Sequence, residues 1–217
     1  MPAPRALSEL PYAAHLRPFD GELHVESDLD CVHVDGGSYD AFDGGAVRFT
    51  ESALTSTVFT GGRMRRARFN DVWMHTVRFV ATDLVDTHWM DAEVVAGSLA
   101  GLEMFGSQLH RVTFHQCKFD SVNLRSTTLR DVTFVDCLLR DVDFAGAELT
   151  RVSFPGSALE DARFPQARMK DVDLRGAERL GISAGVESLK GATISTAQLL
   201  DFAPLFAQTL GIDVLDR

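Results

Sequence analysis

The sequence repeats with a period of five residues, and this period restricts the fold more than any other feature. Every fifth position from Leu29 to Leu174 is a large apolar residue, with the single exception of Gly44. Two positions before each of these centres the residue is Ala, Val, Ser, Thr, Cys or Gly, except at Phe42 and Leu102. An α-helix repeats every 3.6 residues and a flat strand every 2, so neither produces this pattern.

A chain that turns a corner every five residues does explain the pattern. On each side of such a coil, one large and one small residue point inward, while the residues at the corners face water. Four sides close a coil of 20 residues, and successive coils stack as parallel strands about 4.8 Å apart. The repeat therefore predicts an all-β fold, a right-handed quadrilateral parallel β-helix, over residues 27–176.

Residues 20 apart should then be stacked neighbours, and the sequence allows this register to be tested. Phe114, Phe134 and Phe154 fall in one interior column. An outward column alternates in charge, and it consists of Asp91, Arg111, Asp131, Arg151 and Asp171. Opposite charges on neighbouring strands stabilise a sheet by roughly 0.2–1 kcal/mol each, so the alternation supports the register independently of the apolar pattern.

Segments such as DVTFV and DVDFA resemble the pentapeptide-repeat family, whose motif is a small residue, Asp or Asn, Leu or Phe, and two variable residues. The resemblance covers residues 27–176. It implies the four-sided β-helix and a two-fold dimer through a C-terminal helix. It also implies a function, because family members include rod-like dimers that bind DNA gyrase and protect it from quinolones or other gyrase poisons.

The two ends of the repeat divide the chain into three parts. Residues 1–26 are expected to form an N-terminal cap segment, with Phe19 or Leu23 plugging the first coil, because a stacked β-helix must cover its exposed strand edges. Residues 177–217 are expected to wind the coil down and end in a short α-helix. Ser195 and Gln198 have the spacing of a capping box, and we expect a helix that is kinked or split at Pro204 and stopped at Gly211.

This C-terminal helix carries more apolar surface than one face needs to cap a coil. Two interpretations remain open: the helix only caps its own coil, or it also forms a two-fold homodimer. The predicted dimer interface consists of Leu199, Leu200, Phe202, Leu205, Phe206 and Leu210.

The sequence contains no pattern that indicates catalysis. Phosphate-binding, zinc-protease and serine-hydrolase motifs are absent. His75 and His115 share a column but lie two rungs apart, so we expect solvated surface histidines rather than metal ligands. We therefore predict no enzyme activity, no catalytic residues, no cofactor, no metal and no small-molecule substrate.

Net charge and cysteine content indicate which kinds of partner and which cellular compartment suit this chain. The formal net charge of −10 argues against a protein that binds nucleic acid directly by covering phosphates. Three cysteines, with Cys117 and Cys137 one rung apart in the small-residue column, fit free thiols in a reducing compartment. No apolar run is long enough for a membrane span, and the sequence predicts a soluble, cytoplasmic protein.

Two functions from different classes follow. The first, implied by the family resemblance, is a DNA mimic that binds DNA gyrase or another topoisomerase and protects it from inhibitors, which would confer antibiotic resistance. The alternative is a dimeric protein–protein interaction scaffold with another partner. That alternative predicts apolar contacts at outward positions, and the candidates are Trp73, Val85 and Phe105, with Arg125 beyond them.

Overall fold

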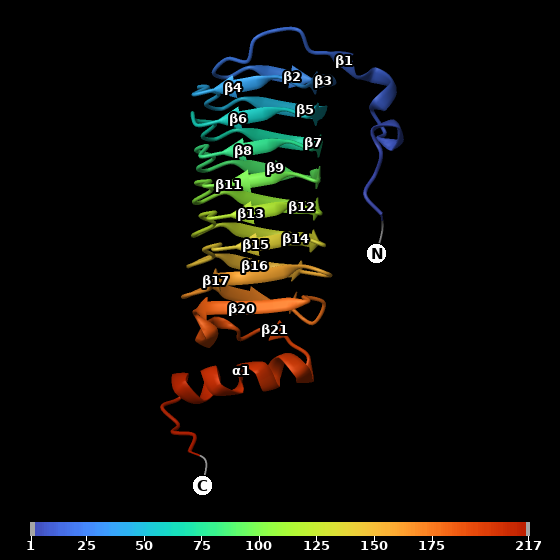
Figure 1. The fold of residues 1–217 in the computed structure, drawn as a ribbon. Coiled ribbons are helices and arrows are strands. Elements are labelled where there is room, and N and C mark those ends of the chain that lie inside the picture. Colours follow the sequence, from blue (N-terminus) through green and yellow to red (C-terminus); the bar gives the residue numbers. More distant parts are fainter. Residues whose placement is uncertain (1–2, 216–217) are drawn as a thin grey trace.

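The computed structural model describes residues 3–215, and it confirms the predicted β-helix: about eight coils stack into a rod with one short helix at the C-terminal end (Figure 1). All strand pairs are parallel. The first sheet contains β1 (Arg17–Pro18), β2 (Asp28–Asp30), β3 (Val32–Asp35), β5 (Arg48–Thr55), β7 (Arg68–His75), β9 (His88–Met90), β10 (Glu93–Val95), β12 (Gln108–His115), β14 (Thr128–Val135), β16 (Glu148–Ser153), β18 (Arg168–Lys170), β19 (Val172–Asp173) and β21 (Ala192–Thr193).

The second sheet covers another side of the rod. It contains β4 (Ser38–Asp40), β6 (Val58–Thr60), β8 (Arg78–Val80), β11 (Ser98–Ala100), β13 (Lys118–Asp120), β15 (Leu138–Arg140), β17 (Ala158–Arg163) and β20 (Arg179–Ala184). Outside the sheets lie three 3₁₀ turns, η1 (Leu7–Glu9), η2 (Ala13–His15) and η3 (Val186–Ser188), and the helix α1 (Thr196–Thr209).

We number the four sides by their inward centres in chain order. Side 1 has the column from Leu29 to Met169 and side 2 the column from Val34 to Leu174, and the first sheet spans both. Side 3, from Tyr39 to Leu159, is the second sheet. Side 4, from Gly44 to Phe164, is held by single parallel bridges such as Glu103↔Asn123.

The predicted stacking register is confirmed. Phe114 lies opposite Phe134, and their ring centroids are 5.2 Å apart with an interplanar angle of 9°. The next pair, Phe134 and Phe154, stacks at 5.0 Å and 4°. Stacking of this kind adds roughly 0.5–1.5 kcal/mol per pair to the area that the rings bury.

Each corner depends on one residue in the left-handed region of backbone space. The residue two positions after the centre has a positive φ in every repeat from Cys31 to Asp171. At one such corner the Ala67 amide donates a 3.1 Å hydrogen bond to the Met64 carbonyl across Arg66, whose φ is 59°. This is the geometry of a type II turn, in which the third residue requires a positive φ.

The irregular first coil is explained by a compensating pair. Gly44 stands where a large apolar centre belongs, and Phe42 stands where a small residue belongs. A Cβ atom added to Gly44 would lie 2.2 Å from Phe42 Cε1, so the Phe42 ring fills the interior volume that Gly44 leaves open. One rung further, Gly62 has a φ of 75°, and a Cβ there would lie 2.2 Å from the Phe42 carbonyl oxygen.

This pair leads to a testable prediction. Gly44→Leu restores the consensus residue of the repeat, yet we expect it to lower the thermal unfolding midpoint, because overpacking a filled core costs about 1–3 kcal/mol. The double variant Phe42→Ala with Gly44→Leu should recover most of this loss. Thermal unfolding followed by circular dichroism measures both. A single variant as stable as the wild type would contradict the compensation.

The N-terminal residues lie differently from the expectation of a simple cap. Leu23 is buried and Phe19 packs partly against the core, so both contact the first coil as expected. Residues 3–16, which we call the N-terminal arm, instead run along the outside of the rod (Figure 1). The arm carries its own apolar residues and packs them against side 2, where the coil presents an apolar strip.

At the other end, the strict repeat is interrupted by one residue: Leu159 pairs with Leu180, a step of 21. The helix α1 then closes the coil. Its capping box is confirmed, since the Ser195 hydroxyl accepts a 3.2 Å bond from the Gln198 amide. The helix runs through Pro204 without being split, and it ends before Gly211, whose φ is 70°.

Candidate interaction surfaces

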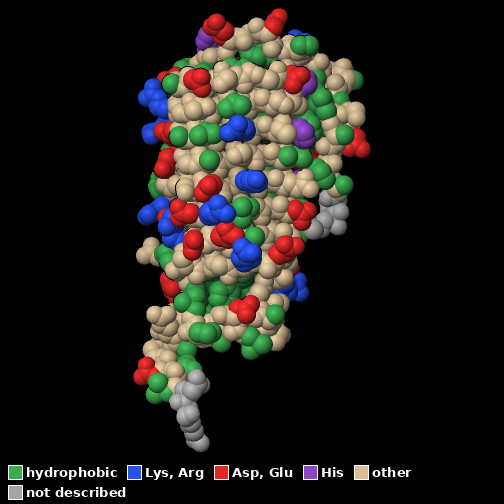
Figure 2. Space-filling view, viewed as in Figure 1, with side chains coloured by type: hydrophobic (Ala, Val, Ile, Leu, Met, Phe, Trp, Pro, Cys, Tyr) green, Lys and Arg blue, Asp and Glu red, His purple; other side chains and the backbone are tan. Residues whose placement is uncertain are grey.

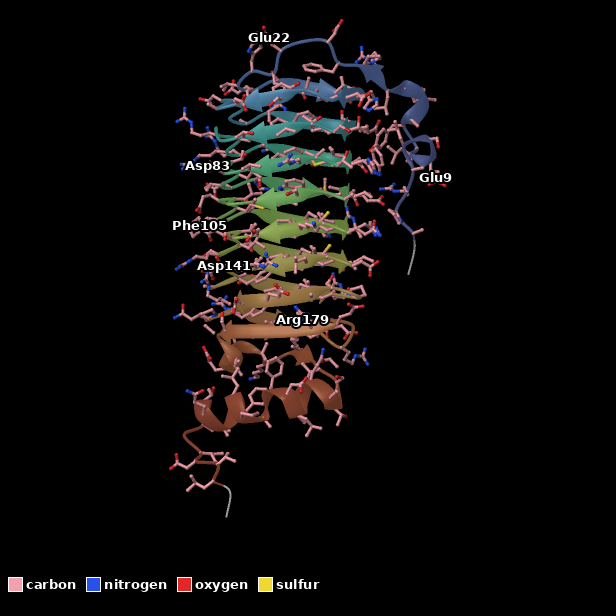
Figure 3. The ribbon with its side chains drawn as sticks, viewed as in Figure 1. Glu9, Glu22, Asp83, Phe105, Asp141 and Arg179 are labelled. Carbon is pink, nitrogen blue, oxygen red and sulfur yellow. The ribbon has the colours of Figure 1, made fainter. Side chains whose placement is uncertain are left out.

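Side 4 presents one exposed aromatic side chain on a rigid surface. Phe105 is 46% exposed and points away from the rod (Figure 3). Val85 precedes it by one rung and is half-buried, and Arg125 follows it by one rung and is exposed. The structure therefore brings three of the predicted contact residues, Val85, Phe105 and Arg125, into one column, which we call the Phe105 patch.

The rim of the Phe105 patch consists of polar side chains held in place by one another. Arg65 Nε lies 2.5 Å from Asp83 Oδ2, and Asn123 Nδ2 donates a 2.6 Å hydrogen bond to Glu103 Oε2. An exposed apolar residue inside an ordered polar rim is the arrangement found at the centre of many protein interfaces.

Trp73, the fourth predicted contact residue, is not open to a partner. It points outward from side 2 as predicted, but it is only 5% exposed because the N-terminal arm covers it. Its Nε1 donates a 3.1 Å hydrogen bond to the Arg5 carbonyl oxygen. The arm residues Leu10 and Tyr12 are buried in the same cluster.

A buried carboxylate lies beside Trp73. Glu93 is at an outward position of β10 but only 6% exposed. Its Oε1 accepts a 2.8 Å bond from the Arg5 amide, and its Oε2 accepts a 2.5 Å bond from Arg5 Nε. We call the surface formed by Ala53, Trp73, Glu93 and Val95 the arm strip.

The expectation of a solvated His115 is wrong. His115 is 4% exposed, and its Nε2 lies 3.6 Å from Glu93 Oε1. Burial lowers its pKa below the usual 6.5, and the nearby carboxylates of Glu93 and Asp136 oppose this shift. The cause of the error is structural, because an outward position is enclosed here by Glu93 and the neighbouring rungs.

The lowered pKa predicts how stability changes with pH. As the pH falls below 6.5, His115 is protonated in the unfolded chain before it is protonated in the folded protein. The free energy of unfolding is therefore highest above pH 6.5 and decreases as the pH falls toward the lower pKa of His115 in the folded state. Each pKa unit between the two states corresponds to about 1.4 kcal/mol. We expect the unfolding midpoint to fall more between pH 7.5 and 5.5 in the wild type than in His115→Gln. His88→Gln, at an exposed position, is the control, and equal falls in all three proteins would refute the prediction.

Several outward carboxylates are paired with arginines along the rod. Arg111 contacts Asp91 through two bonds of 2.5 and 2.6 Å, and Arg151 contacts Asp131 in the same way. Hydrogen bonds from these arginines hold the pKa of Asp91 and of Asp131 below the usual value. Figure 2 shows acidic and basic side chains interspersed on the face in view, not a continuous acidic surface.

The C-terminal helix divides its apolar residues between two faces. Phe202 is buried on the coil end, and Leu205 and Phe206 are half-buried against the same core. Leu199, Leu200 and Leu210 are exposed. Three of the six residues predicted at a dimer interface therefore already pack within the chain, and three remain open.

Sequence reasoning missed the arm contacts of Arg5, Leu10, Tyr12 and Glu93. A signal was present, because the outward positions Ala53 and Val95 on side 2 lack the charge that solvated positions elsewhere carry.

Within residues 3–215, no three His, Cys, Asp or Glu side chains are grouped closely enough to hold a metal ion. No helix in the same residues has the length and apolar content to cross a membrane.

Comparison with solved structures finds that the chain is similar to several pentapeptide repeat proteins. No curated protein matches the sequence. The chain is similar to the crystal structure of HetL, a pentapeptide repeat protein involved in heterocyst differentiation regulation from the cyanobacterium Nostoc sp., with 19% identity over 84% of this chain and 93% of HetL and a TM-score of 0.33. It is also similar to full-length QnrB1, a plasmid-mediated fluoroquinolone resistance protein, with 13% identity over 86% of this chain and 100% of QnrB1 and a TM-score of 0.28.

Residues 107–182 match the family described as Pentapeptide repeat region. The strands before this segment pair in the same register, from Phe49↔Phe69 onward. The resemblance inferred from the five-residue period is thus confirmed for residues 107–182, and the chain as described folds as a parallel β-helix.

Proposed function

We propose that this protein is a non-enzymatic scaffold that binds another protein through the Phe105 patch. The observation that carries the proposal is the exposure of Phe105 on a side of the rod whose backbone is held by bridges on every rung. A large aromatic residue that is ordered before binding loses little conformational entropy when it enters a partner's pocket. The interior of the rod is filled by the chain's own side chains, which favours recognition at the surface.

A photo-crosslinking residue placed at position 105 tests this proposal. We expect it to capture one partner that an excess of wild-type protein competes away, and an excess of the Phe105→Asp variant should not compete. Met90, which is 40% exposed on side 1, is the matched control position. Capture of the same proteins from positions 90 and 105 would refute a specific patch on side 4.

DNA gyrase is the second candidate partner, and the net charge of −10 favours it. A rod that imitates DNA has to present carboxylates in place of phosphates. The N-terminal end is the densest acidic region, with Asp20, Glu22, Glu26, Asp28 and Asp30. The Asp–Arg pairs along side 1 reduce the net acidity there, and for this reason we rank the scaffold first.

A supercoiling assay with purified gyrase, with and without a fluoroquinolone, distinguishes the two candidates. A DNA mimic should inhibit supercoiling at a high protein concentration or restore activity in the presence of the drug. A protein that does neither is not a gyrase-binding DNA mimic.

We further propose that the scaffold is a two-fold homodimer through the exposed face of α1. Leu200 is 69% exposed, and burying apolar surface stabilises association by about 25 cal/mol per Å². Leu200→Glu should give a folded monomer in sedimentation velocity at micromolar concentration. Phe202→Glu should instead destabilise the protein, because Phe202 packs on the coil end. A wild-type protein that sediments as a monomer would rule out the dimer.

A further inference from the structure

The arm strip differs from the other outward surfaces of the rod. Outward positions elsewhere carry mostly charged or small polar residues, whereas the strip combines Trp73, Ala53 and Val95 with one carboxylate. All four side chains are buried, and three of them form one apolar cluster with Leu10 and Tyr12 of the N-terminal arm. The strip therefore has the composition of a binding site, and the chain's own N-terminal segment occupies it.

The arm is held by side-chain contacts and not by strand pairing. Its bonds to the coil are those of Arg5 with Glu93, the Trp73 indole with the Arg5 carbonyl, and a 3.4 Å bond from the Tyr12 hydroxyl to the Ser52 carbonyl oxygen. Within the part of the chain that the structure describes, strand pairing begins only after the arm, at β1. The arm can consequently open without breaking a single coil–coil hydrogen bond, as weakly attached segments do in local unfolding.

The surroundings of the strip carry more negative than positive charge. Glu51, Asp71 and Asp91 stack along the neighbouring corner, and Asp91 is paired with Arg111. Burial raises the pKa of Asp71, the nearby carboxylates of Asp91 and Glu51 add to this shift, and Arg111 and Arg5 oppose it. The arm supplies a single arginine, Arg5, to this acidic region.

We propose that the arm strip is a docking site for an extended basic segment of another protein, which must displace the N-terminal arm. The partner's arginine takes the place of Arg5 on Glu93, and a large apolar side chain packs on Trp73 as Tyr12 and Leu10 do. Further lysines or arginines, which the arm lacks, face Glu51 and Asp71. The arm acts as an internal competitor that keeps weak ligands out.

This site lies on side 2, opposite the Phe105 patch on side 4. The two binding proposals can therefore be tested independently, and the failure of one does not contradict the other. Figure 3 shows Phe105 on one edge of the rod and the arm, marked by Glu9, along the other edge. The Phe105→Asp variant should leave binding at the arm strip unchanged.

The test uses the full chain and a labelled synthetic peptide of residues 3–18. The Arg5→Ala protein loses the arm's bonds to Glu93, and we expect it to bind the peptide at least tenfold more tightly than the wild type does, because the tethered arm otherwise competes at a high effective concentration. Adding Glu93→Gln should weaken binding at least tenfold, whereas adding Glu103→Gln on side 4 should not. A peptide with Glu9→Lys should bind more tightly than the natural one at low salt.

Two measurements keep the test independent of misfolded variants. A peptide with Arg5→Ala should fail to bind the Arg5→Ala protein. This result would show from the peptide side that binding needs the ion pair between Arg5 and Glu93. Iodide should quench Trp73 fluorescence more in the Arg5→Ala protein than in the wild type, because Trp89 is buried in the core in both.

Several results would overturn the proposal. Equal peptide affinity for the wild type and Arg5→Ala proteins would show that the arm does not compete. Unchanged quenching of Trp73 would show that Glu93 does not hold the arm. A dimer formed by Arg5→Ala alone would show that the strip exchanges arms between copies of this chain and does not receive a different protein.

Discussion

The Phe134→Asp variant is expected to lose the cooperative unfolding transition of the wild type, whereas Asp136→Ala should melt close to it. Phe134 is fully buried and stacks between Phe114 and Phe154. The Phe119 ring packs edge-to-face with it, with ring centroids 5.5 Å apart. Removing such a ring costs about 3–5 kcal/mol, and burying an unpaired carboxylate costs several more. Together these losses approach the whole stability of a typical domain, about 5–15 kcal/mol.

Asp136 is the matched control because it lies two residues away at an exposed corner. Its φ is 51°, and alanine already occupies the same corner position at Ala81 and Ala96 with a similar φ. Exposed substitutions of this kind usually change stability by less than about 0.5 kcal/mol. Thermal denaturation followed by circular dichroism compares the two variants. Similar midpoints for both would mean that the assignment of inward and outward positions is wrong.

Deleting residues 116–135 should leave a folded rod that is shorter by one coil, whereas deleting residues 116–125 should prevent folding. The first deletion removes one complete coil, which is the observed step between paired strands, and brings Phe114 beside Phe154. Each coil contacts only its neighbours, so a missing coil is tolerated. It also places Arg111 beside Arg151, a like-charge contact that costs at most about 1 kcal/mol.

The shorter deletion removes half a coil. It keeps the five-residue repeat but moves every later strand to the opposite side of the rod. Circular dichroism and sedimentation velocity distinguish a folded, compact rod from an unfolded chain. If both deletions gave equally folded proteins, a coil of four sides could not be correct.

The sequence alone determined the path of the rod. The alternation of large and small inward residues from Leu29 to Leu174 specifies five residues per side, and the charge column from Asp91 to Asp171 specifies 20 per coil. The sequence predicted these features because each coil buries its own large apolar residues. The spacing of residues along the chain therefore determines which of them are buried in every repeat. The capping box at Ser195 and the stop at Gly211 are local for the same reason.

Other features do not follow from the five-residue repeat, and the sequence predicted them only in part. The exposure of Phe105 followed from its outward position, and the structure confirms it. The prediction that Pro204 kinks or splits the helix is wrong as to a split, because α1 is continuous through Pro204. Phe202, Leu205 and Phe206 on either side of Pro204 all pack on the coil end.

The arm and its strip were decided by tertiary structure alone. Arg5 and Glu93 are 88 residues apart, and nothing in the local spacing of either predicts that they meet. The arm has no repeat, and its place depends on which side of the rod offers Trp73, Ala53 and Val95 together. Glu93 is buried at an outward position because Arg5 of the arm binds it, and His115 is buried beside Glu93. The repeat determines on which side of the coil a residue lies, but its exposure depends on what else packs against it.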